Sequence, residues 1–267
     1  MKRLKFIFDY LNRKRLTTVA GAWVFFFLTS VVPIAFLILT AFGVFGVSIT
    51  EDLVSRLPEE FRETGQAIAS TAERATRGTT VFFVLSVIIS CTTLLNQMSK
   101  DGDSLYGVLA RNKRGIFRRV WAFFALGVLF LAFLALALLF SFGSVLFKDK
   151  MAYLSNKLAI TLLAFALIMF FGYFIIVVLN KFISPVRLKF KQLWLGSLVS
   201  LFIIVLGTIA FVIYLRYFKS YNAFYGSLTA IIVFLLWTYI VMLGLVGGVI
   251  VNTEVYNSRL RIDSKAN

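Results

Sequence analysis

Residues 221–254 read YNAFYGSLTAIIVFLLWTYIVMLGLVGGVIVNTE, and they carry no charged side chain before Glu254. A helix that crosses the hydrocarbon core of a membrane needs roughly 20 apolar residues. The uncharged run is much longer than that, so it predicts a membrane-spanning helix over residues 224–251 with polar residues at both ends.

The interior of this predicted helix holds two kinds of residue that indicate packing against protein. Gly244, Gly247 and Gly248 cluster near its end, and Gly244 and Gly248 have the spacing that lets two helix backbones approach closely. Trp237 and Tyr239 lie deep in the run, where an indole N–H or a phenol O–H needs a partner or a polar cavity. We therefore expect a tight helix crossing at the glycines.

The composition of the whole chain extends the membrane assignment beyond this one helix. Of the 267 residues, 60% are hydrophobic and only 15% are charged, and the mean hydropathy is +0.90. A soluble domain of this composition does not have enough polar surface to cover itself. The net charge of +16 would indicate nucleic acid in a soluble protein. Here we expect no nucleic-acid partner, because the cytoplasmic loops of membrane proteins collect Lys and Arg.

Five more apolar runs precede the last one, so we expect an all-α, polytopic membrane protein with six transmembrane helices in one domain, residues 18–257. An amphipathic segment, 1–17, would lie on the membrane before it, an external helical loop, 48–78, would follow the first span, and 258–267 would form a cytoplasmic tail. The predicted spans are residues 18–44, 79–95, 120–147, 158–179, 192–215 and 224–251.

The loops between these spans differ in charge, and the difference predicts the orientation. When alternate loops are assigned to opposite sides, one side holds 19 of the 28 Lys and Arg residues and the other side holds 9. The basic side is cytoplasmic by the positive-inside rule. Both termini are then expected in the cytoplasm, in a multi-pass protein of the bacterial inner membrane.

Residues for catalysis or metal binding are scarce. The chain has no histidine and one cysteine, Cys91, which we expect to be a small packing residue. No Asp, Glu, Lys or Arg lies in the middle of a predicted span, although such groups usually mark ion or proton pathways. We therefore expect no enzyme activity, no catalytic residues, no metal site and no cofactor.

Several motifs resemble one known family. The stretches YNAFYGSL, LLWTY and GGVIVNTE look like the C-terminal signature of the YihY/BrkB family of bacterial inner-membrane proteins, once misnamed ribonuclease BN. SPVRLKFKQLWLGSLVS and FVIYLRYFKSY resemble the preceding helix of that family, and AGAWVFFFLTSVVPIAFLI and LLNQMSKDGDSLYGV resemble its first two helices. The resemblance implies six membrane helices but supplies no settled activity, and no residues here support the ribonuclease label.

Pro33 should bend the first predicted span and free the carbonyl of Thr29, beside the hydroxyls of Thr29 and Ser30. A plain packing kink and a hinge or polar notch both remain open. At the predicted outer end of the last two spans, Arg216 is either a headgroup anchor or a phosphate ligand.

The polar side chains that remain inside the predicted spans are uncharged, and they are compatible with two functions. The first is the movement or handling of a lipid-like amphiphile, and the alternative is a non-catalytic envelope scaffold. Membrane lipids are the expected partners, a lipid-like substrate belongs to the first function, and a homo-oligomer is left open. The candidate pathway residues are Thr29, Ser30, Pro33, Asn96, Arg216, Tyr221, Tyr225, Gly226, Trp237 and Tyr239.

Overall fold

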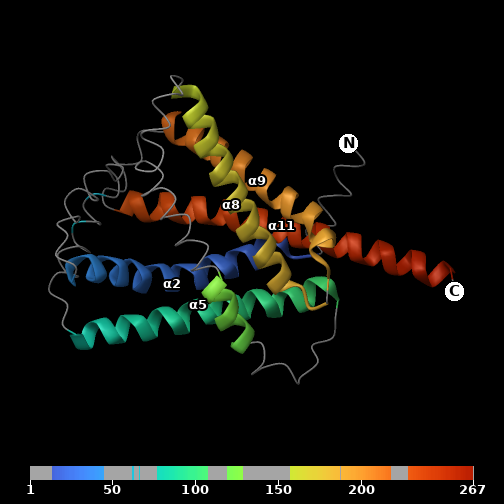
Figure 1. The fold of residues 1–267 in the computed structure, drawn as a ribbon, viewed down its shortest axis with the longest axis horizontal. Coiled ribbons are helices and arrows are strands. Elements are labelled where there is room, and N and C mark those ends of the chain that lie inside the picture. Colours follow the sequence, from blue (N-terminus) through green and yellow to red (C-terminus); the bar gives the residue numbers. More distant parts are fainter. Residues whose placement is uncertain are drawn as a thin grey trace. The chain divides into compact units, whose positions relative to one another are not determined.

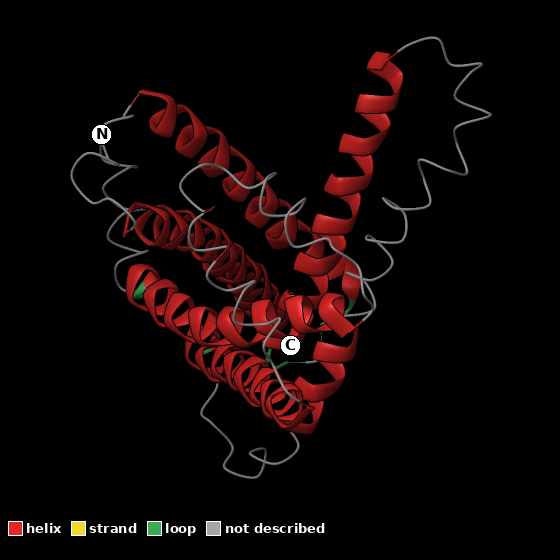
Figure 2. Ribbon diagram, turned by 90° about the vertical axis from the view of Figure 1, so that its left-hand side faces the viewer, coloured by secondary structure: helices red, strands yellow, loops and turns green. Residues whose placement is uncertain are grey.

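The protein is helical throughout the part of the chain that the computed structural model describes, residues 14–44, 62, 66, 77–107, 119–128, 157–186, 188–217 and 228–266. Figure 2 shows helices and short loops only in these ranges, which confirms the predicted all-α class. The labelled helices in Figure 1 are α2 (Leu16–Val44), α5 (Arg77–Tyr106), α8 (Lys157–Ile183), α9 (Phe190–Tyr217) and α11 (Leu228–Ala266), and a short helix spans Arg119–Val128.

Four of the described helices are long and apolar enough to cross a membrane. Their apolar parts are Val81–Tyr106, Phe165–Ile183, Phe190–Leu215 and Ile231–Arg259. Shorter apolar helices occur at Leu16–Val31 and Arg119–Val128, where the first and third spans are predicted. The protein is therefore multi-pass by helix length and composition, and the count of six spans stays a prediction. Most of the segment 1–17 lies outside the described residues, and so does the loop 48–78 apart from residues 62, 66, 77 and 78, the last two of which begin α5.

Two helices continue past the predicted ends of their spans. The helix α5 runs on from Leu95 to Tyr106, and α11 runs through the predicted tail to Ala266. Hydropathy falls in these extensions, but their residues are compatible with a helix, and no proline interrupts them. The helix α5 ends where Gly107 adopts a left-handed φ of 69° and its N–H donates to the carbonyl of Ser104 at 3.1 Å, as is common after the last helical residue.

The chain divides into two compact units. The first unit contains residues 1–97 and 203–246, and the second unit contains residues 98–202 and 247–267. The helices α5, α9 and α11 each contribute one segment to each unit.

The core of the first unit joins α2, the first part of α5 and the neighbouring parts of α9 and α11. Trp23 is fully buried, and the rings of Phe27 and Phe234 lie 6.5 Å apart between centroids. Gly207 lies so close to Ile240 that a Cβ atom there would meet its side chain. Aromatic rings and a close helix approach therefore hold this unit together.

In the second unit, α8 and α9 are joined by a tightly bonded turn. Ser184 donates its backbone N–H to Asn180 at the end of α8 and its hydroxyl to the carbonyl of Val186 at 3.1 Å. At the start of α9, Gln192 accepts the backbone N–H of Lys189 at 2.8 Å through its side chain and donates its own N–H back to the Lys189 carbonyl, also at 2.8 Å. The bond to the Gln192 side chain is one half of a capping box, and the backbone bond closes the first turn, so the local sequence helps to set where α9 begins.

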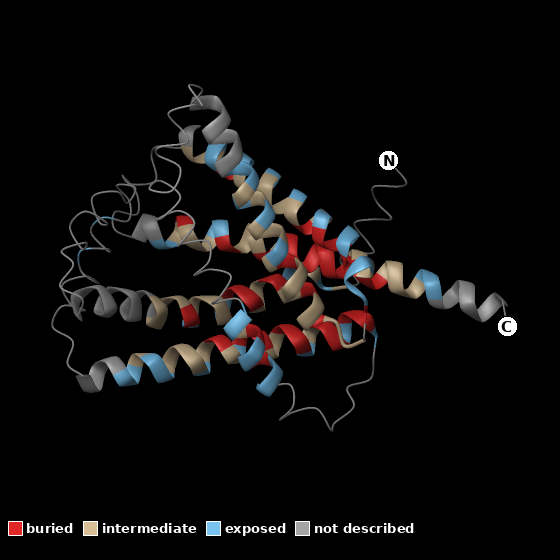
Figure 3. Cartoon of the chain, viewed as in Figure 1, coloured by how far each residue is buried: buried red, intermediate tan, exposed pale blue. Residues whose placement is uncertain are grey.

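Large apolar side chains remain exposed along the outer faces of the helices. Figure 3 shows exposed positions along α8 and α9, and along α11 a continuous buried run from Gly244 to Ile250. Phe170, Trp194 and Phe202 are each more than half exposed. Such faces would be unfavourable in water but match the hydrocarbon of a bilayer, so they are lipid-facing surfaces.

The predicted orientation has a direct test. Because the more basic loops should face the cytoplasm, both termini should be inaccessible from outside intact cells. Cysteine introduced near residue 265, combined with Cys91→Ala, should not react with an impermeant maleimide until the membrane is permeabilised. A control cysteine in the predicted external loop, near residue 66, should react in intact cells. External labelling of the C-terminus would reject the six-span arrangement.

Candidate functional site

The predicted pathway residues that the structure describes all belong to the first unit. Thr29, Ser30 and Pro33 lie on α2, and Asn96 lies on α5. Trp237 and Tyr239 lie on α11. Arg216 lies in the last turn of α9, and nothing is described of its side chain, while Tyr221, Tyr225 and Gly226 lie outside the described residues.

The hydroxyls of Thr29 and Ser30 both bond within their own helix, in the turn before Pro33. Both donate to the carbonyl of Phe26, at 2.8 Å and 3.0 Å, and not to the carbonyl of Thr29. A hydroxyl has only one hydrogen, and in a helix the carbonyl of the preceding turn is the acceptor within reach. The Ser30 oxygen also lies within hydrogen-bonding reach of Cys91 on α5. We therefore interpret this part of α2 as a packing contact with α5.

Trp237, Tyr239 and Asn96 lie on different parts of the first unit. Trp237 is 37% exposed and packs against Phe234, with the ring centroids 6.4 Å apart. Tyr239 and Asn96 are half-buried. The neighbouring Thr238 is buried and bonds within its own helix, to the carbonyl of Phe234 at 2.8 Å. Among the described residues, Thr29 and Ser30 bond Phe26 and Trp237 packs on Phe234, and neither contact joins two of the predicted pathway residues.

Polar contacts between helices occur instead in the second unit, where sequence reasoning placed no site. The amide Nδ2 of Asn180 on α8 donates to the hydroxyl of Ser197 on α9 at 2.8 Å. The side-chain oxygen Oδ1 of Asn252 on α11 accepts the backbone N–H of Gly196 at 3.1 Å. We call Asn180, Ser197, Ser200 and Asn252 the amide–hydroxyl cluster; each is at most 1% exposed.

Glycine permits the close approach that the cluster requires. A Cβ atom on Gly196 would collide with the carbonyl oxygen of Gly248 and with the side chain of Asn252. A Cβ atom on Gly248 would collide with the carbonyl oxygen of Gly196 and the hydroxyl of Ser200. The backbones of α9 and α11 are thus in contact at this pair. The structure places Gly248 at such a crossing and leaves Gly244 and Gly247 buried on the same helix.

Three atoms of the cluster have no hydrogen-bond partner among the described residues. They are Oδ1 of Asn180, Oγ of Ser200 and Nδ2 of Asn252. Other buried hydroxyls differ, because Thr253 bonds its own helix at the carbonyl of Val249, at 2.9 Å. A buried polar group without a partner costs about 1–3 kcal/mol of folding free energy. The described protein atoms therefore leave three hydrogen-bonding groups of the cluster unsatisfied.

Towards the end of α5, the second unit has a further polar contact region. The Tyr106 hydroxyl lies within hydrogen-bonding reach of Ser184 and Thr253, and its ring lies 6.1 Å from that of Tyr256. Gly102 packs so closely on Ile183 that a Cβ atom there would collide with the Ile183 carbonyl. These contacts join α5 to α8 and α11 next to the cluster.

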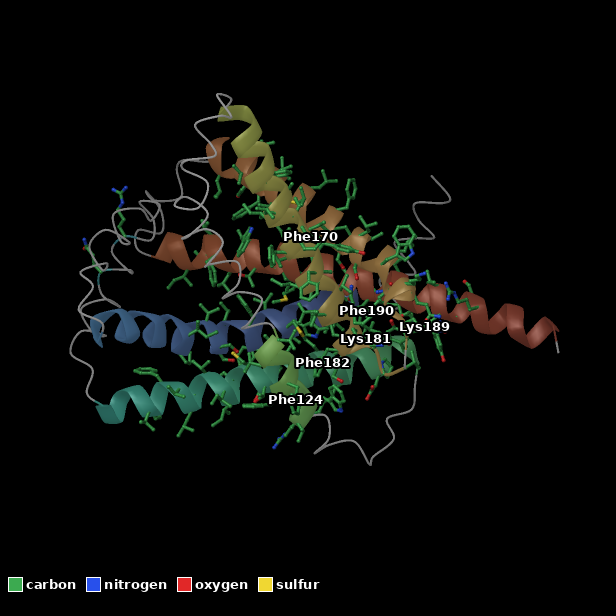
Figure 4. All side chains as sticks on the ribbon, viewed as in Figure 1. Phe124, Phe170, Lys181, Phe182, Lys189 and Phe190 are labelled. Carbon is green, nitrogen blue, oxygen red and sulfur yellow. The ribbon has the colours of Figure 1, made fainter. Side chains whose placement is uncertain are left out.

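Cationic and aromatic side chains meet at the turn between α8 and α9. The Nζ atom of Lys181 donates to the carbonyl of Leu188 and lies 5.6 Å from the centroid of the Phe190 ring. Figure 4 labels Lys181, Lys189 and Phe190, which lie together at this turn. Lys189 and Phe190 are exposed. A cation beside an exposed aromatic ring is typical of the level where lipid headgroups meet hydrocarbon.

In the described residues no group of three or more His, Cys, Asp or Glu side chains could hold a metal ion. The polar atoms available at the cluster are instead amides and hydroxyls, which donate and accept hydrogen bonds without charge.

Sequence reasoning missed the cluster, but one signal for it was present. Gly196 and Ser200 on α9 repeat the spacing of Gly248 and Asn252 on α11, a small residue followed four positions later by a polar one. This spacing lets one helix place a polar side chain against the bare backbone of another. The sequence did not reveal which of several such helices are neighbours.

Long apolar helices, apolar outer surfaces and buried amides and hydroxyls that join the helices together define a polytopic helical membrane protein. The virulence factor BrkB family matches residues 7–267, so the chain belongs to this family. This confirms the resemblance to the YihY/BrkB family inferred from the motifs.

Two relatives illustrate how far the similarity extends. A UPF0761 membrane protein of Haemophilus influenzae is 25% identical over 235 residues, which is 85% of this chain and 84% of that protein. A UPF0761 membrane protein of Coxiella burnetii is 33% identical over 61 residues, 23% of this chain, so the match spans only 22% of that relative. No solved structure matches the chain.

Proposed function

We propose that this protein binds a lipid-like amphiphile in the bacterial inner membrane and moves it across or within the bilayer. The observation that carries the proposal is the contrast between the outside and the inside of the helices. Apolar side chains such as Phe170 and Phe202 face outwards, whereas Asn180, Ser200 and Asn252 bury amide and hydroxyl groups inside. An amphiphile presents the same two chemistries, an apolar tail and a polar head.

The amide–hydroxyl cluster contains no charged side chain. This favours facilitated movement of the lipid over movement coupled to protons or sodium ions. Coupled transporters usually place ionisable groups in their membrane helices. The proposal involves no catalytic step. The cationic turn at Lys181 and Lys189 supports it further, because such a turn attracts the phosphates of anionic lipids.

A non-catalytic scaffold of the envelope is the second candidate. The close crossing of Gly196 and Gly248 favours it, because two helices whose backbones touch leave no passage for a lipid between the two glycines. A scaffold would not move lipid, so one assay separates the two functions.

Purified protein reconstituted in vesicles should accelerate the movement of a fluorescent anionic phospholipid between leaflets, compared with protein-free vesicles. Arg216→Gln should reduce the rate by about tenfold, because a lost charge-assisted hydrogen bond to phosphate is worth about 1.5–3 kcal/mol. Fluorescence quenching by dithionite measures the rate.

Lys219→Gln is the matched control for this prediction. This variant removes a lysine cation three residues from Arg216 and leaves the Arg216 guanidinium in place. It should retain most of the wild-type rate of lipid movement. If wild-type vesicles transfer no anionic lipid, the scaffold function replaces the proposed one. If Arg216→Gln loses thermal stability in proportion to its rate, Arg216 is only a packing residue.

A further inference from the structure

The residues that carry the unpaired atoms of the amide–hydroxyl cluster are linked through one segment of α9 in the second unit. Ser197 and Ser200 are three residues apart on α9, and Gly248 and Asn252 are four residues apart on α11. Gly248 touches Ser200, Gly196 bonds Asn252, and Ser197 bonds Asn180. Residues 196–200 of α9, little more than one helical turn, therefore contact the residues of α8 and α11 that carry the other two unpaired atoms.

The hydrogen-bond directions define what ligand the cluster can accept. The Gly196 N–H needs an acceptor, so Oδ1 of Asn252 must face it, and Nδ2 of Asn252 is left as a donor. Nδ2 of Asn180 donates to Ser197, so Oδ1 of Asn180 is left as an acceptor. The hydroxyl of Ser200 can do either.

In this orientation of the two amides, a charged ligand does not fit the set. A cation would meet the N–H groups of Asn252, and an anion would meet the carbonyl oxygen of Asn180. A neutral hydroxyl fits, because it donates one hydrogen bond and accepts two. If the Asn180 amide is turned around, the Ser197 hydroxyl becomes the donor and Nδ2 of Asn180 is left over. A hydroxyl oxygen still accepts from both amides.

We propose that the amide–hydroxyl cluster is a binding site for one neutral hydroxyl group, held between α8, α9 and α11. A water molecule supplies such a group, and a buried water typically makes about three hydrogen bonds, the number of unpaired atoms here. The hydroxyl of a lipid headgroup has the same chemistry. That second source rests on the proposed function, whereas the site itself does not.

A double-mutant cycle of Asn180→Leu and Ser200→Ala tests the site in the purified full-length protein. The unpaired atoms of these residues do not bond each other, so a ligand that both of them bond is the coupling that the cycle is designed to detect. Each single variant should lower the Tm by about 2–4 °C. The double variant should fall no further than the worse single variant, because the first change already releases the hydroxyl.

The control cycle pairs Ser200→Ala with Thr253→Val. Thr253 is equally buried, but its hydroxyl is satisfied within its own helix, so these two shifts should add. If Asn180→Leu does not fold, Asn252→Leu takes its place in the cycle. Additive shifts in the test cycle under every condition would overturn the proposal.

Repeating the cycle in different media distinguishes the two sources of the hydroxyl. Non-additive shifts in lipid-free detergent identify water. Non-additive shifts that appear only with added dioleoylglycerol, and not with the same lipid acetylated at its hydroxyl, identify a headgroup. Either result supports the site. Additive shifts with intact lipid movement in vesicles reject only the site, and coupled shifts without lipid movement reject only the proposed function.

Discussion

Replacement of Gly248 by alanine should destabilise the protein by about 3 kcal/mol, and Gly248→Leu should cost more. An added Cβ atom would overlap the carbonyl oxygen of Gly196, which is backbone and cannot turn away as a side chain can. The two helices must then separate, which also breaks the bond between Gly196 and Asn252. The Tm in detergent should fall by roughly 10 °C for Gly248→Ala, measured by the fluorescence of a thiol-reactive dye or by light scattering.

Gly172→Ala provides the matched control in the same unit. Gly172 lies within α8, and a Cβ atom there meets nothing within 4 Å. Alanine is favoured over glycine in a helix interior by about 0.5–1 kcal/mol, so this variant should be as stable as the wild type or slightly more stable. Equal melting temperatures for Gly248→Ala and Gly172→Ala would contradict the close crossing.

The crossing shows how much of this fold the sequence alone predicts. The spacing of Gly244 and Gly248 indicated a close approach, because small residues four positions apart expose one strip of backbone. It did not indicate Gly196 as the opposite residue, since the spacing describes one helix and not its neighbour. The all-α class and most of the apolar helices follow from composition and periodicity. Which helices pack against each other depends on tertiary packing.

The predicted pathway illustrates the same limit. Thr29 and Ser30 are polar residues beside a proline, so the sequence made them candidate pathway residues and left both a packing kink and a polar notch open. Their hydroxyls instead bond the Phe26 carbonyl, a local option open to any helical Ser or Thr. An amide carries both donors and an acceptor, which one local carbonyl cannot satisfy, and Asn180 and Asn252 bond other helices. In a membrane helix, buried asparagine therefore indicates an interhelical contact more reliably than a hydroxyl does.

Asn252→Asp should be among the most damaging isosteric changes in the chain. Asn252 is 1% exposed, and the cluster around it consists of amides and hydroxyls without a charged member. At pH 7.5 the new carboxylate would still accept the hydrogen bond from the Gly196 N–H. On folding, however, it would lose its hydration and find no counter-ion in the cluster. A buried charge without its partner costs about 3–5 kcal/mol, so the folded yield and the Tm should both fall sharply.

Two companion variants separate charge from packing. Asn252→Leu removes the Gly196 bond but adds no charge, so it should cost only about 1 kcal/mol. Asn257→Asp adds the same charge to the same helix at a half-buried position and should change the Tm little. From most to least stable, the expected order is therefore Asn257→Asp, Asn252→Leu and Asn252→Asp. If Asn252→Asp has the same Tm as the wild type while Asn252→Leu has a lower one, the cluster is open to bulk water or to a cation. A closed site for a neutral hydroxyl group is then wrong.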